Sequence, residues 1–568
     1  MRRVMRALVL ILLASAIGIH GPAVGSVHGV ARDQLERRMS FHNRLLLNRA
    51  VLAGLKSIEV LVLASAGDTP GRRGVSGARR VDFESADASA LVERLGGRVR
   101  WTDEAIGYLR VVVPTHRLLE LAGSRAVGAY QIASFSKASW YRDGPPLSNA
   151  EMYRGFEVAP IAVPDPDKGD PGLPLLTVAE SRASGFTAEE DAGVGDWMKE
   201  HPTFDGRGVT IALVESALPN FADPAFRSAK TLDGRDVAKI AGIVNTIDPG
   251  GSDETRVQLD TQVSARTSWA RIGRRTFILP RPGIYRVGLL GLPGGGNVLH
   301  EFGVAEHQQT HELWIDSDGD GSFADETPLA DINVRFEPRF LELTHPARIK
   351  VSFVMGRGRL PHTVHIYVGR GSHQSMAMSV AAGTATDESL AYGVAPGARV
   401  LLVRSTEQEY VLSGIVEGFI EAARRTDVDV ISASAGIKIL TDTETDFTGL
   451  LFSRLLSVYR KPIINAAGNF HLQLGASYAM GASWAVGGTL GPATLAALHG
   501  SRPLNRVIAH PYGAAGPSLD GAIKPDFLAP MERLATALPW QQPISGLPRN
   551  APTRHVPPGY QISCCTSA

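Results

Sequence analysis

The chain contains little cysteine and no surplus of either charge. Cys564 and Cys565 are the only cysteines among 568 residues, and they are neighbours. Adjacent cysteines cannot join distant segments, so a disulfide framework is excluded. Lysine and arginine number 58 against 57 aspartates and glutamates, which gives a net charge of +1. Because this balance provides no basic surface for polyanions, we expect neither nucleic acid nor an anionic membrane as a partner.

Long hydrophobic runs are also missing, apart from a short one at the N-terminus. Arg2, Arg3 and Arg6 precede the apolar run at residues 7–19, and small residues follow it. A basic start, a short apolar centre and a small-residue exit predict a secretory signal peptide over residues 1–25. A membrane anchor, the alternative, needs about 20 apolar residues. We therefore expect a secreted or periplasmic protein that is free of the membrane after signal removal.

The pattern of apolar segments divides the remaining chain. Residues 55–135 alternate strand, helix, strand, helix and strand patterns, which predicts a small α+β domain. Residues 136–200 are rich in Pro, Gly and Asp and indicate a linker. From residue 204 to 568, short apolar runs that end in small or polar residues alternate with helical stretches, as in a parallel α/β sheet. Within this region, frequent turns between alternating strands at about 246–366 predict a β-rich insertion.

Four distant segments carry side chains suited to acyl transfer. Glu215 ends the first apolar run of the α/β region, His373 precedes a helix of small residues, Asn469 closes a later run, and Ser567 lies near the chain end. Acyl transfer needs a nucleophile, a base, a carboxylate that orients the base, and a donor to the oxyanion. Each segment alone is typical of a cap, a turn or a frayed end. The hypothesis of a hydrolytic site therefore depends on the combination.

The same segments resemble the subtilisin-like serine proteases (subtilases). The motifs that carry the resemblance are FDGRGVTIALVES (204–216), GSHQSMAMSVAAG (371–383), GVAPGARVLLVRS (393–405), VISASAG (430–436), INAAGN (464–469), AAGPSLDGAIKPDFLAP (514–530) and GYQISCCTSA (559–568). The resemblance implies an α/β subtilisin-like parallel-sheet catalytic domain over 204–568, incomplete at its C-terminus. It implies a serine endopeptidase with polypeptide substrates, in which Glu215, His373 and Ser567 form the triad and Asn469 lines the oxyanion hole.

Further roles follow from the position of each motif in the family. The resemblance implies that the backbone of Ser434, Ala435 and Gly436 pairs with an extended substrate, and that Ala467 and Gly468 line the pocket before the cleaved bond. The 55–135 unit resembles a subtilase propeptide, which implies a ferredoxin-like α+β domain. Such a propeptide acts as an intramolecular chaperone and inhibitor, so the chain would be a zymogen with its own propeptide as a partner.

Several residues depart from the family pattern. The first triad position is Glu215 instead of Asp, which extends the carboxylate by one methylene; Asp223 is a lower-ranked alternative carboxylate. Gln374, Ser375 and Met376 replace Gly, Thr and His after the triad histidine. These changes leave open a pseudoprotease that acts as an exported binding module. A third hypothesis is a calcium-dependent adhesion protein built around residues 246–366.

The end of the chain also departs from the family. Cys565 replaces a glycine, and only Ala568 follows Ser567, where the family continues with a long buried helix. Such a helix would hold the nucleophile and add positive potential near it. Two interpretations remain open: a longer chain of which this is a part, and a truncation that abolishes activity.

An acidic segment at residues 316–326, DSDGDGSFADE, provides a separate signal. Carboxylates at positions 1, 3 and 5 with Gly at position 6 are typical of the start of a Ca²⁺ loop. Position 12, which carries an acidic ligand in such loops, is Thr327 here. The alternative is an acidic β-turn. We predict a structural Ca²⁺ site and no cofactor for catalysis, and the predicted ligands are Asp316, Asp318, Asp320, Asp325 and Glu326.

Overall fold

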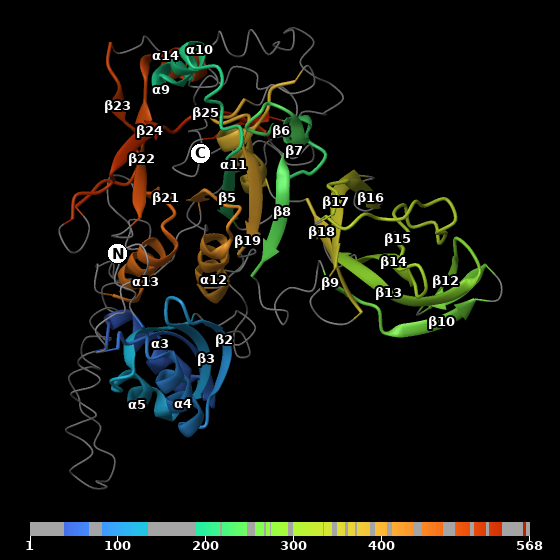
Figure 1. Ribbon diagram of the computed structural model, residues 1–568, viewed down its shortest axis with the longest axis horizontal. Helices are drawn as coiled ribbons and strands as arrows, with labels where there is room; N and C mark the ends of the chain where they lie inside the picture. The colour runs from blue at the N-terminus through green and yellow to red at the C-terminus, as the bar shows by residue number, and fades with distance from the viewer. Residues whose placement is uncertain are drawn as a thin grey trace, which may run out of the picture.

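The computed structural model consists of three bodies, which Figure 1 shows as a small α+β body, a central sheet with helices, and a group of strands to one side. It describes residues 39–67, 82–133, 189–215, 218–246, 256–265, 268–272, 274–293, 299–332, 334–343, 349–357, 362–369, 372–386, 392–405, 412–434, 446–469, 483–499, 505–517, 522–536 and 560–563. The predicted signal peptide, Ala435, Gly436 and Ser567 lie outside these residues. Among the described helices, none combines the length and apolar character needed to cross a membrane.

The N-terminal body is a four-stranded antiparallel sheet with helices. Its elements are α3 (Phe41–Leu52), β1 (Ser57–Ala64), α4 (Ser85–Arg94), β2 (Arg98–Asp103), β3 (Tyr108–Pro114), α5 (Leu118–Ala122) and β4 (Val127–Ile132), and the strand order is β2-β3-β1-β4. The sequence pattern predicted three of these strands. It missed β2 because that strand is mostly exposed or half-buried and has no apolar run.

The central body is a mostly parallel sheet. Its strands are β5 (Thr210–Glu215), β8 (Ile240–Asn245), β19 (Arg399–Arg404), β20 (Val430–Ala433), β21 (Ile463–Ala466), β22 (Trp484–Leu490), β23 (Ile508–Ala509) and β24 (Phe527–Pro530). The order is β23-β22-β21-β20-β5-β19-β8, with β24 also paired to β22, and only the pairing of β23 with β22 is antiparallel. Apolar residues alternate between the two faces of these strands, so helices cover both faces.

Different helices cover the two faces of the central sheet. Val214 and Val403 pack with α12 (Leu412–Arg424) and α13 (Phe447–Tyr459), whereas the neighbouring Leu213 and Leu402 pack with α11 (Ser372–Ala382). Further elements at the rim are η2 (Pro224–Phe226), β6 (Ser228–Lys230), β7 (Asp236–Ala238), α14 (Pro492–His499), β25 (Arg533–Thr536) and β26 (Tyr560–Ser563).

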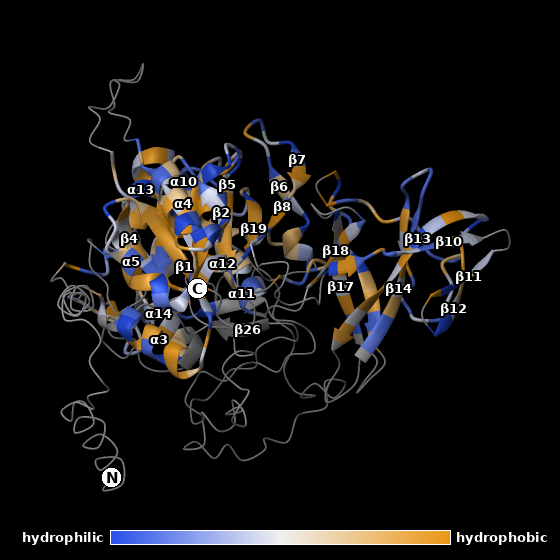
Figure 2. Cartoon of the chain, turned by 90° about the horizontal axis from the view of Figure 1, so that it is seen from below, coloured by the Kyte–Doolittle hydropathy of each residue, from blue (hydrophilic) through white to orange (hydrophobic). Residues whose placement is uncertain are grey.

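Residues 256–368 form antiparallel strands that lie between Glu215 and His373 in the chain. Two four-stranded sheets, β10-β13-β14-β15 and β16-β17-β18-β9, share one apolar core, as in a sandwich. Their strands are β9 (Arg256–Gln258), β10 (Thr261–Ala265), β13 (Gly283–Pro293), β14 (Leu299–His307), β15 (Leu313–Ile315), β16 (Arg339–Leu343), β17 (Ile349–Arg357) and β18 (Thr363–Val368), and the hairpin β11 (Trp269–Ile272)–β12 (Arg275–Ile278) adjoins them. Figure 2 shows these strands apart from the helices.

The predicted linker over 136–200 is partly helical. Its last residues form α9 (Glu189–Ala192) and α10 (Val194–Glu200), and the residues before 189 lie outside the described part. The Asp191 carboxylate accepts hydrogen bonds from the backbone N–H groups of Ala493 and Thr494 and from the Thr494 hydroxyl. Asp191 thus caps the N-terminus of α14 from far away in sequence, a contact that local composition does not reveal.

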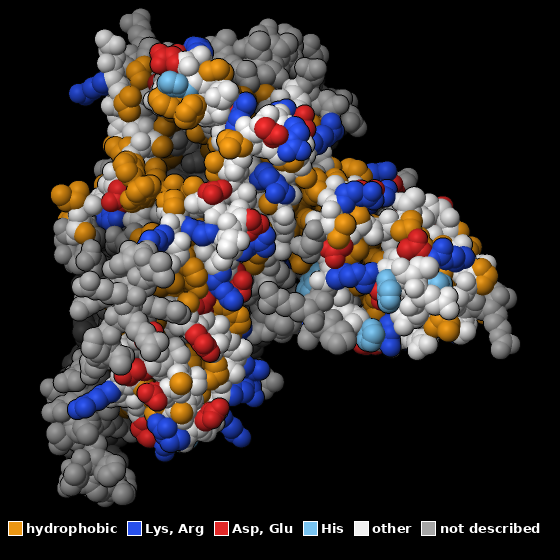
Figure 3. All heavy atoms as spheres, viewed as in Figure 1, with side chains coloured by type: hydrophobic (Ala, Val, Ile, Leu, Met, Phe, Trp, Pro, Cys, Tyr) orange, Lys and Arg blue, Asp and Glu red, His pale blue; other side chains and the backbone are white. Residues whose placement is uncertain are grey.

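An apolar surface lies over β22 and β24. The side chains of Trp484, Phe527 and Leu528 are exposed, and the Trp484 and Phe527 rings meet edge to face with centroids 5.7 Å apart. Figure 3, in the view of Figure 1, shows hydrophobic side chains gathered in this region of the molecule.

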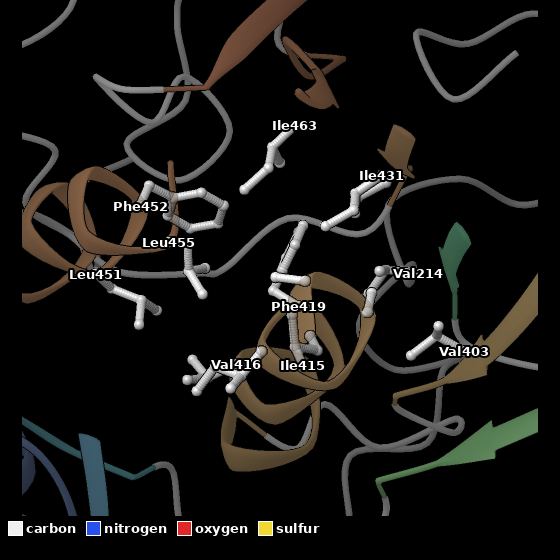
Figure 4. Close-up of a cluster of buried hydrophobic side chains, with 14 of the residues drawn as sticks. Val214, Val403, Ile415, Val416, Phe419, Ile431, Leu451, Phe452, Leu455 and Ile463 are labelled. Atoms are coloured by element: carbon white, nitrogen blue, oxygen red, sulfur yellow. The ribbon is translucent and has the colours of Figure 1, made fainter. Parts of the chain in front are cut away.

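The N-terminal sheet packs against α12 and α13 of the central body. Alternate residues of β1 face opposite ways: Val60 and Val62 pack on the helices of the N-terminal body, and Leu61 and Leu63 join the core of the central body. Figure 4 shows that core, in which Phe419 of α12 and Phe452 of α13 lie among strand residues. Burial on both faces explains why β1 is an almost unbroken apolar run.

Polar contacts complete this interface. The Arg454 guanidinium of α13 donates to the backbone oxygens of Ile106 (2.8 Å) and Ala64 (2.7 Å) and lies 4.1 Å from the Phe83 ring centroid. The Tyr459 hydroxyl donates to the Asp103 carboxylate at 2.7 Å. Arg454 therefore satisfies two carbonyl oxygens that the docked sheet removes from water.

Arg454→Ala should weaken the docking of the N-terminal body. The change leaves the two carbonyl oxygens without their donor, at a cost of about 1–3 kcal/mol. Hydrogen exchange by mass spectrometry should show faster exchange in β1 and β3 of the variant. Ser453→Ala, at the exposed neighbouring position of α13, should leave the exchange unchanged. Equal protection in Arg454→Ala and wild type would contradict this role.

A buried carboxyl lies at the same interface. Glu417 of α12 is 2.8 Å from the Arg110 guanidinium and accepts a hydrogen bond from the Tyr108 hydroxyl at 3.3 Å. Burial raises the pKa of Glu417 to about 8, although Arg110 acts in the opposite direction. Glu59 also lies 3.6 Å from Arg110, so Arg110 keeps a carboxylate partner when Glu417 is protonated.

The free energy of unfolding should therefore fall as pH rises from about 4.5 to about 8, because in this range Glu417 is protonated only in the folded protein. The unfolded carboxyl loses its proton near pH 4.5 and the folded one near pH 8, so folding takes up a proton between these values. The slope is at most about 1.4 kcal/mol per pH unit. Urea unfolding of wild type and Glu417→Gln should diverge across this window, with the wild type losing stability relative to the variant. Parallel pH profiles would refute the assignment.

Candidate active site

Glu215 is the last residue of β5, between the parallel neighbours β19 and β20. Its side chain is only 1% exposed. The Ser405 backbone N–H and hydroxyl both donate to the Glu215 backbone oxygen at 3.0 Å, which fixes the strand end. A carboxylate buried to this degree needs polar partners inside the protein.

Those partners are His373 and Ser434. His373, in the first turn of α11, lies with its Nδ1 2.9 Å from Oε2 of Glu215, and the Ser434 backbone N–H donates to Oε1 at 3.2 Å. The His373 side chain is 40% exposed. The two residues are 158 positions apart in sequence. The arrangement lets the carboxylate orient an imidazole that is still partly exposed.

The carboxylate of Glu215 can bond to the imidazole although its side chain is longer than that of Asp. Glu215 spans the gap to Nδ1 at an ordinary hydrogen-bond distance and also accepts from Ser434. The side chain of Glu215, one methylene longer than Asp, therefore reaches the imidazole in this structure. Asp223 has another role, because its Oδ1 accepts from the Ala225 N–H at 2.9 Å and caps η2.

Three of the predicted segments end at one edge of the sheet. Glu215 ends β5, Ser434 follows β20, and Ala467, Gly468 and Asn469 follow β21, and these strands are consecutive, parallel neighbours. The carboxyl ends of parallel strands form the usual ligand edge of such sheets. Asn469 is exposed there, and Gly468 has a φ of 106°, a conformation that favours glycine.

The residues after His373 serve packing. Gln374, Ser375 and Met376 are buried; the Ser375 hydroxyl accepts from the Asn220 N–H at 2.9 Å, and Met376 packs against Val380. These contacts hold the first turn of α11 to its neighbours. The departures from the family pattern thus lie in the interior, while His373 stays at the surface.

A second histidine–carboxylate pair was not predicted from the sequence. Nε2 of His510 lies 2.9 Å from Oε1 of Glu532, and its Nδ1 accepts from the Tyr512 N–H at 3.1 Å. The two side chains are 3% and 4% exposed. Both ring nitrogens are engaged inside the protein, so this pair ties β23 to the segment between β24 and β25. The pair at His373 is the one that a ligand can reach.

Comparisons with known proteins agree with the sequence motifs. The model of the subtilase family matches residues 359–555. No curated protein matches the chain. The match confirms the predicted resemblance to the subtilases over these residues.

Solved structures of proteases and peptidases also align with the chain, at low identity. Tripeptidyl peptidase 2 aligns with TM-score 0.43 and 13% identity over 59% of this chain and 31% of its own. The epidermin leader peptide processing serine protease (EpiP) of Staphylococcus aureus gives 0.39 and 10% over 90% and 85%. Fervidolysin of Fervidobacterium pennivorans, a keratinolytic enzyme related to subtilisin, gives 0.39 and 12% over 90% and 52%. The chain thus spans about a third of the first structure and about half of the third.

Shortening the carboxylate should lower peptidase activity, although it restores the residue type of the family. Glu215→Asp withdraws the carboxylate by about one C–C bond, about 1.5 Å, from both Nδ1 and the Ser434 N–H. A misplacement of about 1 Å costs roughly 100-fold in rate. The kcat for a peptide substrate should fall by about this factor. Asp223→Asn, at the cap of η2, should leave kcat unchanged. A rise in kcat in Glu215→Asp would show that the present geometry is not the working one.

Proposed function

We propose that the protein is a secreted serine endopeptidase that cleaves peptide bonds through an acyl-enzyme. The observation that carries this proposal is the 2.9 Å contact between the buried Glu215 carboxylate and the partly exposed His373 imidazole. Nδ1 is the nitrogen that a triad carboxylate holds, and this contact sets the tautomer in which Nε2 acts as the base. The match of residues 359–555 to the subtilase family supports the same chemistry.

The catalytic steps follow from the roles of these groups. Ser567 attacks the carbonyl carbon while Nε2 of His373 takes its proton, and Glu215 stabilises the imidazolium. The Asn469 amide donates to the oxyanion of the tetrahedral intermediate, a contact worth about 3–4 kcal/mol. His373 then returns the proton to the leaving amine, and a water activated in the same way hydrolyses the ester. The backbone around Ser434 binds an extended substrate as an added strand.

The chain path favours Ser567 as the nucleophile. β25 lies against α11, the helix of His373, and pairs with β26 through Arg533 and Ser563. Ser563 is the last residue of β26 and precedes Ser567 by four positions in the sequence. Ser567 itself lies outside the described residues.

We extend the proposal to the N-terminal body, which would act as a ferredoxin-like propeptide of a zymogen. Its support is the strand order β2-β3-β1-β4 and the apolar docking of β1 on α12 and α13. A sheet that completes the core around Phe419 and Phe452 stabilises the helices it covers. This contact is suited to a folding chaperone that remains bound as an inhibitor, and secretion accords with the predicted signal peptide.

The alternative is a pseudoprotease that serves as an exported binding module. Glu215 in place of Asp favours it, and so does Gln374, whose Nε2 is buried without a hydrogen-bond partner among the described residues. Both hypotheses use the same fold and differ only in the reactivity of Ser567.

A fluorophosphonate probe should separate them. The probe reacts with a serine that an adjacent base activates, so peptide mapping should find the label on Ser567. The label should be lost in Ser567→Ala and in His373→Ala, and it should persist in Ser563→Ala. Circular dichroism should show that each variant is folded. Absence of label on Ser567 in the folded wild type, after proteolytic removal of the inhibitory N-terminal body, would reject the endopeptidase and support the pseudoprotease.

A further inference from the structure

The acidic segment at 316–326 forms a compact loop after β15. One carboxylate oxygen each of Asp316, Asp318 and Asp320 lies within 4.8 Å of the others. The N–H groups of Gly321, Asp320 and Ser322 donate to Asp316, Asp318 and Asp320 at 3.2, 3.2 and 2.7 Å. These contacts fold the loop, but any acidic turn can make them.

A second observation sets this loop apart from an acidic turn. The side chain of Asp316 is 0% exposed, and its Oδ2 has no hydrogen-bond partner among the residues that the structure describes. Nη2 of Arg275 lies 3.6 Å from Oδ2. That guanidinium donates instead to the backbone oxygens of Glu301 (2.6 Å) and Gly319 (2.9 Å). A buried carboxylate oxygen without a donor is costly, and a bound ion accounts for it.

The local charges favour a divalent cation. Three carboxylates lie together, and Arg275 forms an ion pair with one of them, Asp316, so the group of three carboxylates and this guanidinium keeps a negative excess. A cation of charge +2 bound among the three carboxylates would offset the repulsion between them. It would also give Oδ2 of Asp316 a partner.

We propose that the loop binds one Ca²⁺ ion through Asp316 Oδ2 and the carboxylates of Asp318 and Asp320. Ligands at Ca–O distances of about 2.3–2.6 Å can lie up to about 5 Å apart, which the observed spacing meets. An all-oxygen set favours Ca²⁺ over Zn²⁺. Asp325 and Glu326, predicted from the sequence as further ligands, lie outside the group of three. Glu326 instead accepts from the Ser317 N–H at 2.6 Å and holds the loop closed.

The role of the ion follows from the backbone contacts of the loop. Asp316 N–H donates to Gly303 of β14 (3.0 Å), Glu342 N–H of β16 donates to Ser317 (2.9 Å), and Gly321 accepts from Ile278 of β12 (2.8 Å). The loop therefore links both sheets of the sandwich and its hairpin. Ca²⁺ should stabilise this body, which precedes His373 in the chain, and this inference stands whether or not the peptidase proposal holds.

Calorimetric titration of the full chain with Ca²⁺, after removal of metals with a chelator, tests the site. We expect one ion with a Kd between about 10⁻⁶ and 10⁻³ M and a higher Tm in saturating Ca²⁺. Asp318→Asn, at an exposed position that keeps the fold, should weaken binding at least about tenfold, and Asp316→Asn should abolish it. Asp260→Asn, an exposed acid elsewhere in the sandwich, should bind as wild type does.

Arg275→Gln separates the proposal from a metal-free loop. If Ca²⁺ neutralises the three carboxylates, the positive charge of Arg275 repels it, so the loss of that charge should strengthen Ca²⁺ binding. If Arg275 alone neutralises Asp316, the wild type should bind no Ca²⁺, and the variant should only lose stability. Absence of binding to wild type, or equal affinity in Asp318→Asn and wild type, would overturn the proposal.

Discussion

The hydrogen bond between Glu215 and His373 is the contact on which the functional account depends. It joins the end of the first strand of the central sheet to a histidine 158 residues later, in the first turn of a helix that follows an entire β-sandwich. A carboxylate in the interior is stable only where it is paired, so the strand end, the helix start and the Ser434 backbone must assemble together. The fold supplies this because neighbouring parallel strands end at the same edge.

The N-terminal sheet shows how one strand can contribute to the cores of two bodies. Alternation along β1 sends one set of side chains into the N-terminal helices and the other into the core beneath α12 and α13. The N-terminal sheet therefore completes the central body instead of resting on its surface. The buried Glu417, beside Arg110 and Tyr108, adds a group whose ionisation opposes this docking as pH rises.

Sequence patterns indicated much of this arrangement, and the exceptions have physical causes. The apolar runs that became β5, β19, β20 and β21 were visible because both faces of a central strand are buried. The pairing of His373 with a carboxylate at residue 215 followed from motif spacing in the family, not from any local pattern. β2 was missed because it buries little. His510 with Glu532, and Asp191 at α14, escaped notice because such contacts depend on tertiary packing. Ser567 lies outside the described residues, so its role is still a prediction.

The central claim is that Glu215 holds the His373 imidazole through Nδ1, and proton NMR tests it most directly. A hydrogen-bonded ring N–H that exchanges slowly should give a low-field resonance that disappears in His373→Ala. The account predicts that this resonance is lost in Glu215→Gln. It should be kept in Glu532→Gln, which alters only the buried pair of His510 and Glu532. A His373 resonance that is indifferent to Glu215→Gln would contradict the account.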